Sequence, residues 1–341
     1  MRRTVYKARR RKRGGVAGGL ALLVIGGAVA GVSILSGGRG GDEAEALAAR
    51  LSEQRRPPAE LVSGLARAHR IVVLGDIHGH AGAKRTAADV IVTLAQGSGL
   101  DAVALEVDSD LQPVIDLYLA TTPEDASILL NADGVLNEAW GTGGAYLDLY
   151  RTVWRVNREL GADRSIRLIA VDLPDWPPGG ALSPADAAER YGRRDAHMAA
   201  VLDSAVLVPT PRARVLAFVG GYHALRGVDG LLRAGGGDPI RIGWLASRLR
   251  ARYPGEVVNV LMDAAARPGA HDPVASYAGT RFYDMLRGQM ESGAFGVPVG
   301  RGFDFARQPV PTHAGPGLEL EFTPDDYRMS DVADGYIMLD G

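Results

Sequence analysis

Short runs of consecutive apolar residues alternate with amphipathic stretches along most of the chain, a pattern typical of strands separated by helices. The predicted strands cover 71–74, 102–105, 166–171, 215–219, 257–262 and 336–339. The predicted helices cover 81–95, 111–119, 146–160, 184–202 and 220–232. Continuous apolar strands, in contrast to alternating ones, are buried on both faces. The pattern therefore predicts an α/β fold with a largely parallel central sheet flanked by helices on both faces.

A separate apolar run precedes this region, extending from Val16 to Leu35 without a charged residue. Its length is close to the roughly 20 residues that cross a bilayer. Eight Arg and Lys residues lie within the first thirteen positions, whereas acidic residues follow the run at 42, 43 and 45. This asymmetry predicts a transmembrane helix whose N-terminus stays in the cytosol. Small residues at 28–30 leave a cleaved signal peptide as the alternative.

These features predict four parts of the chain. We expect a basic cytosolic segment at 1–13, a transmembrane signal anchor at 14–38, a spacer at 39–60 and one α/β domain at 61–341. The predicted location is the cell membrane, crossed once, with the C-terminal domain outside the cytoplasm. The sequence makes no prediction of oligomeric state.

Charge and cysteine content narrow the classes of function. Beyond residue 13 the chain carries 30 basic against 40 acidic residues, a net charge of −10. Nucleic-acid binding requires a basic face, so we expect no nucleic-acid partner. The chain contains no cysteine, which excludes disulfides and a thiol nucleophile.

Polar side chains follow three of the predicted strands, at the point where each strand ends. His78 follows the first strand, Glu106 the second and His223 the strand at 215–219. Because the carboxyl ends of parallel strands share one edge of the sheet, these side chains are expected to meet in a crevice there. Two imidazoles and a carboxylate, with Asp76 nearby, could ligate a divalent metal. Without a metal, the same three groups could activate a water molecule as a general base.

The motifs around these residues resemble the superfamily that joins erythromycin esterase-like proteins, ChaN-like haem-binding lipoproteins and the TIKI/TraB group. The shared elements are Gly75-x-x-His78, Ala104-Leu105-Glu106, Arg194-Asp195-x-x-Met198-Ala199, Gly220-x-x-His223 and a closing Ala-Asp-Gly-Tyr-Ile at 333–337. The resemblance implies a reactive or ligating centre of His78, Glu106 and His223, with Arg194 on a facing helix and Asp172 at the end of the third strand. An exposed helix face is the alternative for Arg194.

The chain departs from this superfamily at two points. Asp76 replaces the usual glutamate, and His223 alone stands where esterase-like members carry His-Asn-x-His. The sequence Gly-Asp-Ile-His-Gly at 75–79 also resembles the first metal motif of calcineurin-like phosphoesterases, but their later motifs do not occur here.

Two functions follow from this resemblance. The first is a membrane-anchored extracytoplasmic hydrolase that cleaves an ester or peptide bond of a small-molecule or peptide substrate, with or without a divalent metal. The second is a ChaN-like haem- or metal-binding protein of the cell envelope, in which Tyr222 joins the histidines as a cofactor ligand. A catalytically inactive envelope scaffold is a third class, consistent with the shortened side chain at Asp76.

Overall fold

The computed structural model describes residues 49–339, apart from 51–52, 133, 137–142, 177–181, 236, 265–292, 301–305, 308–311, 316 and 324–326. The predicted basic segment and transmembrane anchor lie outside the described residues, as does most of the predicted spacer. Among the helices that the structure describes, none combines the length and the apolar character needed to cross a bilayer. Helix α2 (Pro58–Ala66) begins within the predicted spacer.

A central sheet of seven strands, counted within the described part of the chain, has the order β3-β2-β4-β1-β7-β13-β8. All neighbouring strands are parallel except β13 and β8, which are antiparallel. The strands are β1 (Ile71–Asp76), β2 (Ala102–Asp108), β3 (Arg167–Asp172), β4 (Val215–Gly220), β7 (Val257–Asp263), β8 (Phe295–Pro298) and β13 (Gly335–Met338). The prediction of a largely parallel central sheet is confirmed.

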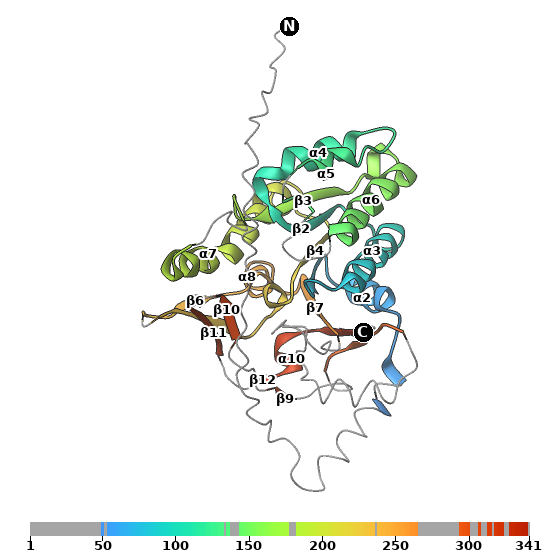
Figure 1. Cartoon of the computed structure of the whole chain (residues 1–341). Helices are drawn as coiled ribbons and strands as arrows, with labels where there is room; N and C mark the ends of the chain where they lie inside the picture. The colour runs from blue at the N-terminus through green and yellow to red at the C-terminus, as the bar shows by residue number, and fades with distance from the viewer. Residues whose placement is uncertain are drawn as a thin grey trace, which may run out of the picture.

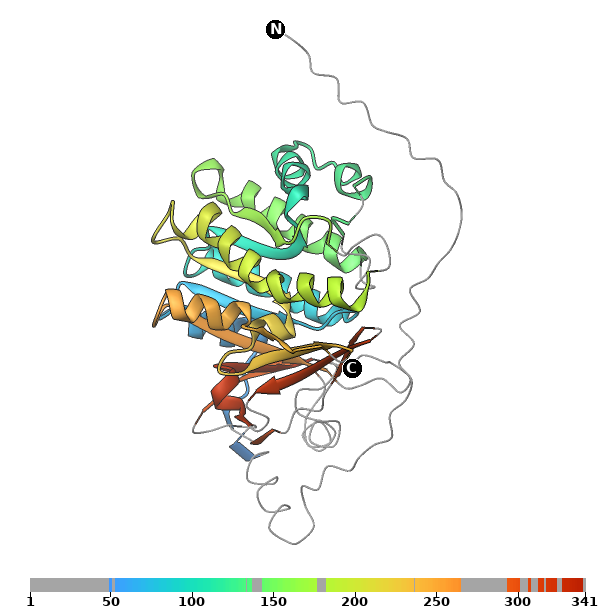
Figure 2. The same cartoon turned by 90° about the vertical axis from the view of Figure 1, so that its left-hand side faces the viewer.

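Helices cover both faces of this sheet, because successive strand residues point to opposite sides and both sides are apolar. Val72 and Leu74 of β1 belong to the core beneath one layer of helices, and Ile71 and Val73 to the core beneath the other. Figure 1 shows the two layers on either side of the strands, and in Figure 2 α7 and α8 face the viewer. The first layer holds α2, α3 (Ala81–Gln96), α4 (Gln112–Ala120), α5 (Ser127–Leu130) and α6 (Gly143–Leu160), and the second holds α7 (Pro184–Leu202) and α8 (Leu245–Arg252).

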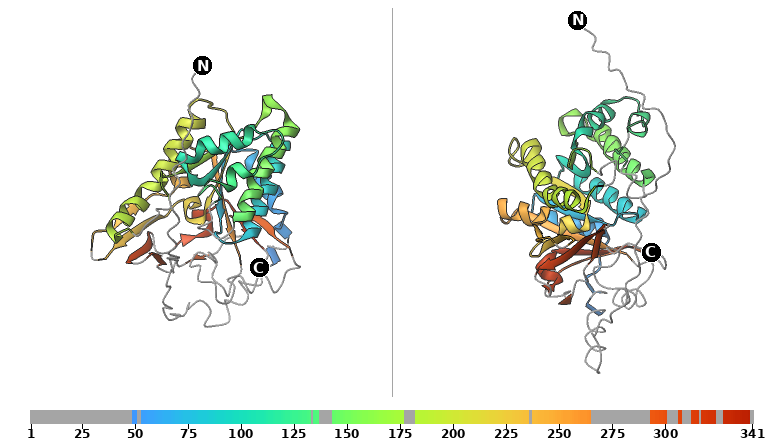
Figure 3. Two further views of the ribbon diagram at one scale, coloured as in Figure 1. Left: turned by 45° about the horizontal axis from the view of Figure 1, so that its top comes forward. Right: turned by 60° about the vertical axis from the view of Figure 1, so that its left-hand side comes forward.

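A second, antiparallel sheet packs on the α7 side of the molecule, and Figure 3 shows its strands beside α7 and α8. Its order is β10-β11-β5-β6, with β5 (Asp229–Ala234), β6 (Ile240–Ile242), β10 (Thr312–Gly315) and β11 (Leu318–Thr323). The predicted helix over 220–232 is therefore wrong. The chain there forms a short 3-10 turn, η5 (Gly221–Ala224), and then β5, because β11 supplies a pairing partner about 90 residues later in the sequence.

Short elements complete the described structure. They are η1 (Ser109–Leu111), η3 (Ala162–Arg164), η4 (Asp203–Leu207), β9 (Ala306–Arg307), β12 (Tyr327–Arg328) and α10 (Met329–Val332).

A buried amide in the centre of β7 connects two of these elements. Asn259 is fully buried, and its Nδ2 donates hydrogen bonds of 2.6 Å to the carbonyl oxygens of Ala224 in η5 and Val332 in α10. Since η5 follows β4 directly and carries His223, this amide holds the turn that presents a predicted site residue.

Replacing Asn259 by alanine is expected to lower the free energy of unfolding by about 2–4 kcal/mol, because two buried carbonyl groups lose their donor. Urea denaturation of the purified protein measures this change. Arg193→Ala on the exposed face of α7 is the control, with an expected change within about 0.5 kcal/mol. Equal stability of the two variants would contradict the assigned role of Asn259.

Candidate functional site

The structure brings together the three predicted side chains at the carboxyl ends of adjacent strands. His78 Nε2 lies 3.9 Å from Glu106 Oε1, and His223 Nε2 lies 3.7 Å from the same oxygen. The adjacency arises because β4 lies between β1 and β2 in the sheet. The side chain of His78 is 24% exposed, whereas that of Glu106 is 1% exposed, so solvent reaches the centre on the His78 side.

Glu106 is buried and its two carboxylate oxygens have different donors. Oε2 accepts a hydrogen bond of 2.6 Å from the backbone N–H of Gly220, and Oε1 accepts one of 2.5 Å from Arg194 Nη2. A Cβ atom at position 220 would lie 2.8 Å from His78 Nε2 and 3.1 Å from Glu106 Oε2. A larger residue in place of the first glycine of Gly220-x-x-His223 would therefore displace His78.

Arg194 enters this centre from α7, and its buried side chain excludes the alternative of an exposed helix face. Its guanidinium forms a bidentate ion pair with Asp172, with distances of 3.0 Å from Nε and 2.6 Å from Nη2. The guanidinium also lies over the ring of Trp176, 4.3 Å from the ring centroid. Paired with two carboxylates and stacked on an indole, Arg194 is held in one orientation toward Glu106.

His223 is oriented by an aspartate to which the sequence patterns assigned no role. Asp195 Oδ1 accepts hydrogen bonds from His223 Nδ1 at 2.8 Å and from the backbone N–H of Leu245 at 2.6 Å. Asp195 is adjacent to Arg194 on α7, and Leu245 is the first residue of α8. The sequence signal that pointed to Asp195 is its place in the motif Arg194-Asp195-x-x-Met198-Ala199. Its burial and its bond to His223 are seen only in the structure.

His78 has a matching partner on the other side of the centre. Its Nδ1 lies 3.1 Å from Asp76 Oδ2, at the end of β1. Both oxygens of Asp76 also accept hydrogen bonds from Lys84 Nζ, at 2.8 and 2.7 Å. Each of the two imidazoles is thus bonded through Nδ1 to a buried aspartate.

Burial and neighbouring charges shift the pKa values of Glu106 and His223 in opposite directions. Burial raises the pKa of Glu106, but Arg194 and the imidazoles of His223 and His78 outweigh it and hold that pKa well below its ordinary value. Burial lowers the pKa of His223, but the carboxylates of Asp195 and Glu106 raise it to about 10. At neutral pH the centre therefore contains an ionised carboxylate and an imidazolium ion next to a guanidinium ion.

A divalent cation at the predicted metal site would need side chains that are free to coordinate it. The carboxylates of Asp76 and Glu106 are already paired with Lys84 and Arg194. Within the described residues, no group of three or more His, Asp or Glu is arranged to hold a metal ion. With both carboxylates paired to cationic side chains, this arrangement does not fit a divalent cation.

Tyr222, the predicted haem ligand, lies in an aromatic cluster beside the second sheet. Its ring centroid is 5.8 Å from that of Trp244 and 5.3 Å from that of Phe322. The rings of His223 and Trp244 make a T-shaped contact, with centroids 6.2 Å apart. These rings form an apolar wall next to the polar centre.

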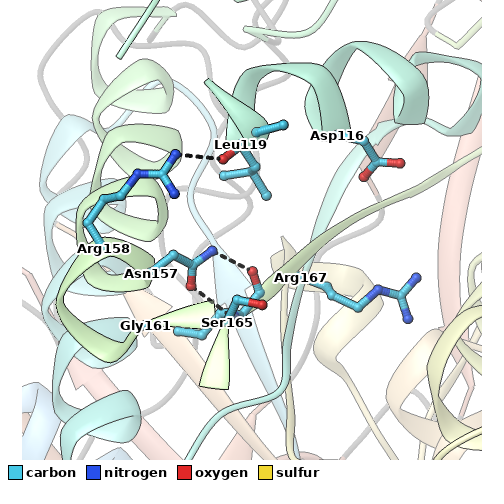
Figure 4. Close-up of a pocket in the computed structure, with 9 residues that line it drawn as sticks. Asp116, Leu119, Asn157, Arg158, Gly161, Ser165 and Arg167 are labelled. Carbon is cyan, nitrogen blue, oxygen red and sulfur yellow. Dashed lines mark hydrogen bonds between the residues drawn. The ribbon is translucent and has the colours of Figure 1, made fainter. Parts of the chain in front are cut away.

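A pocket of about 430 Å³ lies at the amino ends of the strands, where β3 begins, on the side of the sheet away from the polar centre. Figure 4 shows Arg158 bonded to the carbonyl oxygen of Leu119. Asn157 Nδ2 donates a hydrogen bond to the carbonyl oxygen of Ile166. Parallel sheets bind ligands at the carboxyl ends of their strands, which favours the polar centre over this pocket as the reactive site.

Comparisons with known proteins identify the fold. No family model matches the chain, and no match is found among curated protein sequences. A solved structure described as a succinoglycan biosynthesis protein is 11% identical, with a TM-score of 0.59 over 88% of this chain and 97% of that chain. A mutant of erythromycin esterase EreC in its open conformation is 12% identical, with a TM-score of 0.54 over 84% of this chain and 98% of that chain.

The chain has the fold of erythromycin esterase. The resemblance drawn from the sequence motifs is thereby confirmed at the level of fold. A solved structure of haem-bound ChaN of Campylobacter jejuni matches at 15% identity over 64% of this chain and 92% of that chain, with a TM-score of only 0.39.

We expect the ring of His223 to remain protonated until the pH approaches 10. Because the folded-state pKa is raised above its ordinary value of 6.5, this charge contributes stability that is fully present below about pH 6.5 and is lost as the pH rises to about 10. NMR titration of the imidazole measures this pKa, which Asp195→Asn should lower. Glu189→Gln, an exposed change on the same helix, is the control. Titration of His223 near pH 6.5 in the unaltered protein would contradict the assignment.

Proposed function

We propose that this protein is a hydrolase that uses a water molecule activated by His78 to cleave an ester bond. One observation carries the proposal. His78 and His223 are each bonded through Nδ1 to a buried aspartate, and each directs Nε2 toward the same oxygen of Glu106. A general base and a cationic group placed on either side of one carboxylate are the parts that ester hydrolysis requires.

His78 is the group suited to act as the base. The hydrogen bond from Nδ1 to Asp76 favours the tautomer in which Nε2 accepts a proton, as in other aspartate-oriented histidines. Its partly exposed side chain can be reached by water and substrate. In the proposed reaction, His78 Nε2 takes a proton from water as the oxygen attacks the ester carbonyl carbon.

His223 is the group suited to stabilise the negative charge that then develops. Its imidazolium, held by Asp195 and protonated at neutral pH, provides an N–H donor next to Glu106. Such a preorganised donor stabilises the oxyanion of a tetrahedral intermediate. When the C–O bond to the alcohol breaks, His78 returns its proton to the leaving oxygen, so that protons balance over the cycle.

In the proposed reaction, Glu106 and Arg194 hold the catalytic groups in a fixed arrangement. Glu106 accepts hydrogen bonds from Gly220 and Arg194, so its carboxylate is fixed between the two imidazoles. The fold of erythromycin esterase supports an ester over a peptide bond as the target. The apolar run from Val16 to Leu35 and the basic residues before it support a membrane-anchored, extracytoplasmic location for the enzyme.

His78→Ala is expected to lower kcat/KM for ester substrates about 10²- to 10⁴-fold, because general-base catalysis is lost. Hydrolysis of a panel of carboxylic esters and peptides by the purified protein measures the effect. His69→Ala is the control. His69 lies just before β1, at the amino end of the strand and away from the centre, and it bonds the carbonyl oxygen of Leu65. Undiminished hydrolysis by the His78 variant would refute the proposal.

Haem titration of the same protein separates hydrolysis from cofactor binding. A Soret band shift at micromolar protein that is lost in Tyr222→Phe or His78→Ala, together with an absence of hydrolysis, would favour the ChaN-like alternative.

Gly220→Ala is expected to lower kcat for the same esters at least about tenfold, because a Cβ 2.8 Å from His78 Nε2 displaces the base. The matched control is Gly64→Ala in α2, where a Cβ meets no atom within 4 Å. That change should leave kcat unaltered and raise stability by about 0.5–1 kcal/mol through helix propensity. Equal kcat values for the two alanine variants would show that the packing around position 220 does not matter.

A further inference from the structure

Lysine is almost absent from the predicted α/β domain. The chain has 38 Lys and Arg residues, and Lys84 is the only lysine after position 12. Arginine occupies the other basic positions of the domain, including Arg85 immediately after it. Lys84 is also buried, with 1% of its surface exposed, whereas Arg85 is exposed. At this buried position, lysine meets a requirement that arginine would not meet.

The contacts of Lys84 show what that requirement is. Its Nζ donates to Asp76 Oδ1 at 2.8 Å, to Asp76 Oδ2 at 2.7 Å and to the carbonyl oxygen of Ile77 at 3.0 Å. An ammonium group has three N–H donors, and all three are used. Burial of a charge is costly unless it is paired and hydrogen-bonded, and this geometry meets both conditions. A planar guanidinium is larger and has five donors, so it does not match this set of three acceptors.

The aspartate that Lys84 holds is the one that orients the proposed base. Asp76 Oδ2 is shared between Lys84 Nζ and His78 Nδ1, at 2.7 and 3.1 Å. The ammonium therefore fixes the rotamer of the carboxylate, and the carboxylate fixes the ring plane and tautomer of His78. Lys84 itself lies behind Asp76 and is fully covered, so it contacts neither solvent nor the reacting atoms.

We propose that Lys84 is a positioning residue, which holds Asp76 so that His78 presents Nε2 to the reacting water; this inference rests on the proposed esterase function. The chain of contacts runs from Lys84 in α3 to Asp76 at the end of β1 and then to His78. Lys84 reaches the Asp76 carboxylate from α3, the helix that follows the strand.

The first test compares substitutions at Lys84 with Arg85→Gln, an exposed change at the adjacent position. Lys84→Met should lower kcat on the order of 10- to 100-fold with KM changed less than about twofold, because the base is misplaced while substrate contacts remain. Lys84→Gln should retain more activity, since its amide still donates to Asp76. Arg85→Gln should match the unaltered protein. A kcat for Lys84→Met equal to that of Arg85→Gln would overturn the proposal.

The second test removes both buried charges. Lys84→Met alone leaves the Asp76 carboxylate buried and unpaired, which can prevent folding, whereas the double variant leaves no unpaired charge. If Lys84 acts through Asp76, the double variant Lys84→Met/Asp76→Asn should have the same kcat as Asp76→Asn. If the kcat of the double variant were lower than that of Asp76→Asn by the factor that Lys84→Met causes on its own, Lys84 would act independently of Asp76. That result would overturn the proposal.

The third test needs no turnover, and it separates this inference from the proposed function. Nitrogen-15 NMR at a pH where the ring is neutral should show His78 protonated at Nδ1 in the unaltered protein and in Arg85→Gln. Lys84→Gln should shift the ring toward a mixture of tautomers. An unchanged tautomer in folded Lys84→Gln would overturn the positioning role, whereas absence of ester hydrolysis in the unaltered protein would overturn the function alone.

Discussion

The burial of one carboxylate, Glu106, is the constraint on which the rest of the site depends. A charged carboxylate at the end of a central strand is costly unless donors replace the water that it loses. Gly220 provides a backbone N–H, Arg194 provides a guanidinium, and two imidazoles lie within 4 Å. These partners come from β4, α7, the turn after β1 and the turn after β4. The requirement to neutralise Glu106 thus explains why a charged face of α7 lies against the sheet.

Alternating charges extend from this carboxylate in three directions. Lys84 and Asp76 support His78, Asp195 supports His223, and Asp172 supports Arg194. Buried ion pairs contribute little net stability, because desolvation offsets their attraction. In the proposed hydrolase, they would fix the orientation of dipoles and charges before the substrate arrives, which is the main source of electrostatic catalysis in enzymes.

The scaffold around the centre reinforces this arrangement with neutral contacts. Asn259 ties the η5 turn to α10 through two buried hydrogen bonds. Beside that turn, the aromatic rings of Tyr222, Trp244 and Phe322 join the second sheet to the central one. The position of His223 therefore depends on segments from the C-terminal third of the chain, although the residue itself follows β4.

Apolar runs and strand-end residues predicted the parallel sheet and the meeting of His78, Glu106 and His223. They did so because buried parallel strands need continuous apolar residues, and because the carboxyl ends of such strands share one edge. Local periodicity misassigned 220–232 as a helix, since only β11 makes that segment a strand.

The tertiary structure alone decided which charges are paired. Asp195 became the partner of His223, and Lys84 the partner of Asp76, through contacts between separate elements, and the burial of Arg194 followed from its place against β3. A sequence specifies which residues can be charged and which strands can be buried. The distances between segments far apart in the chain determine which charge neutralises which, because Coulomb and hydrogen-bond energies depend on those distances.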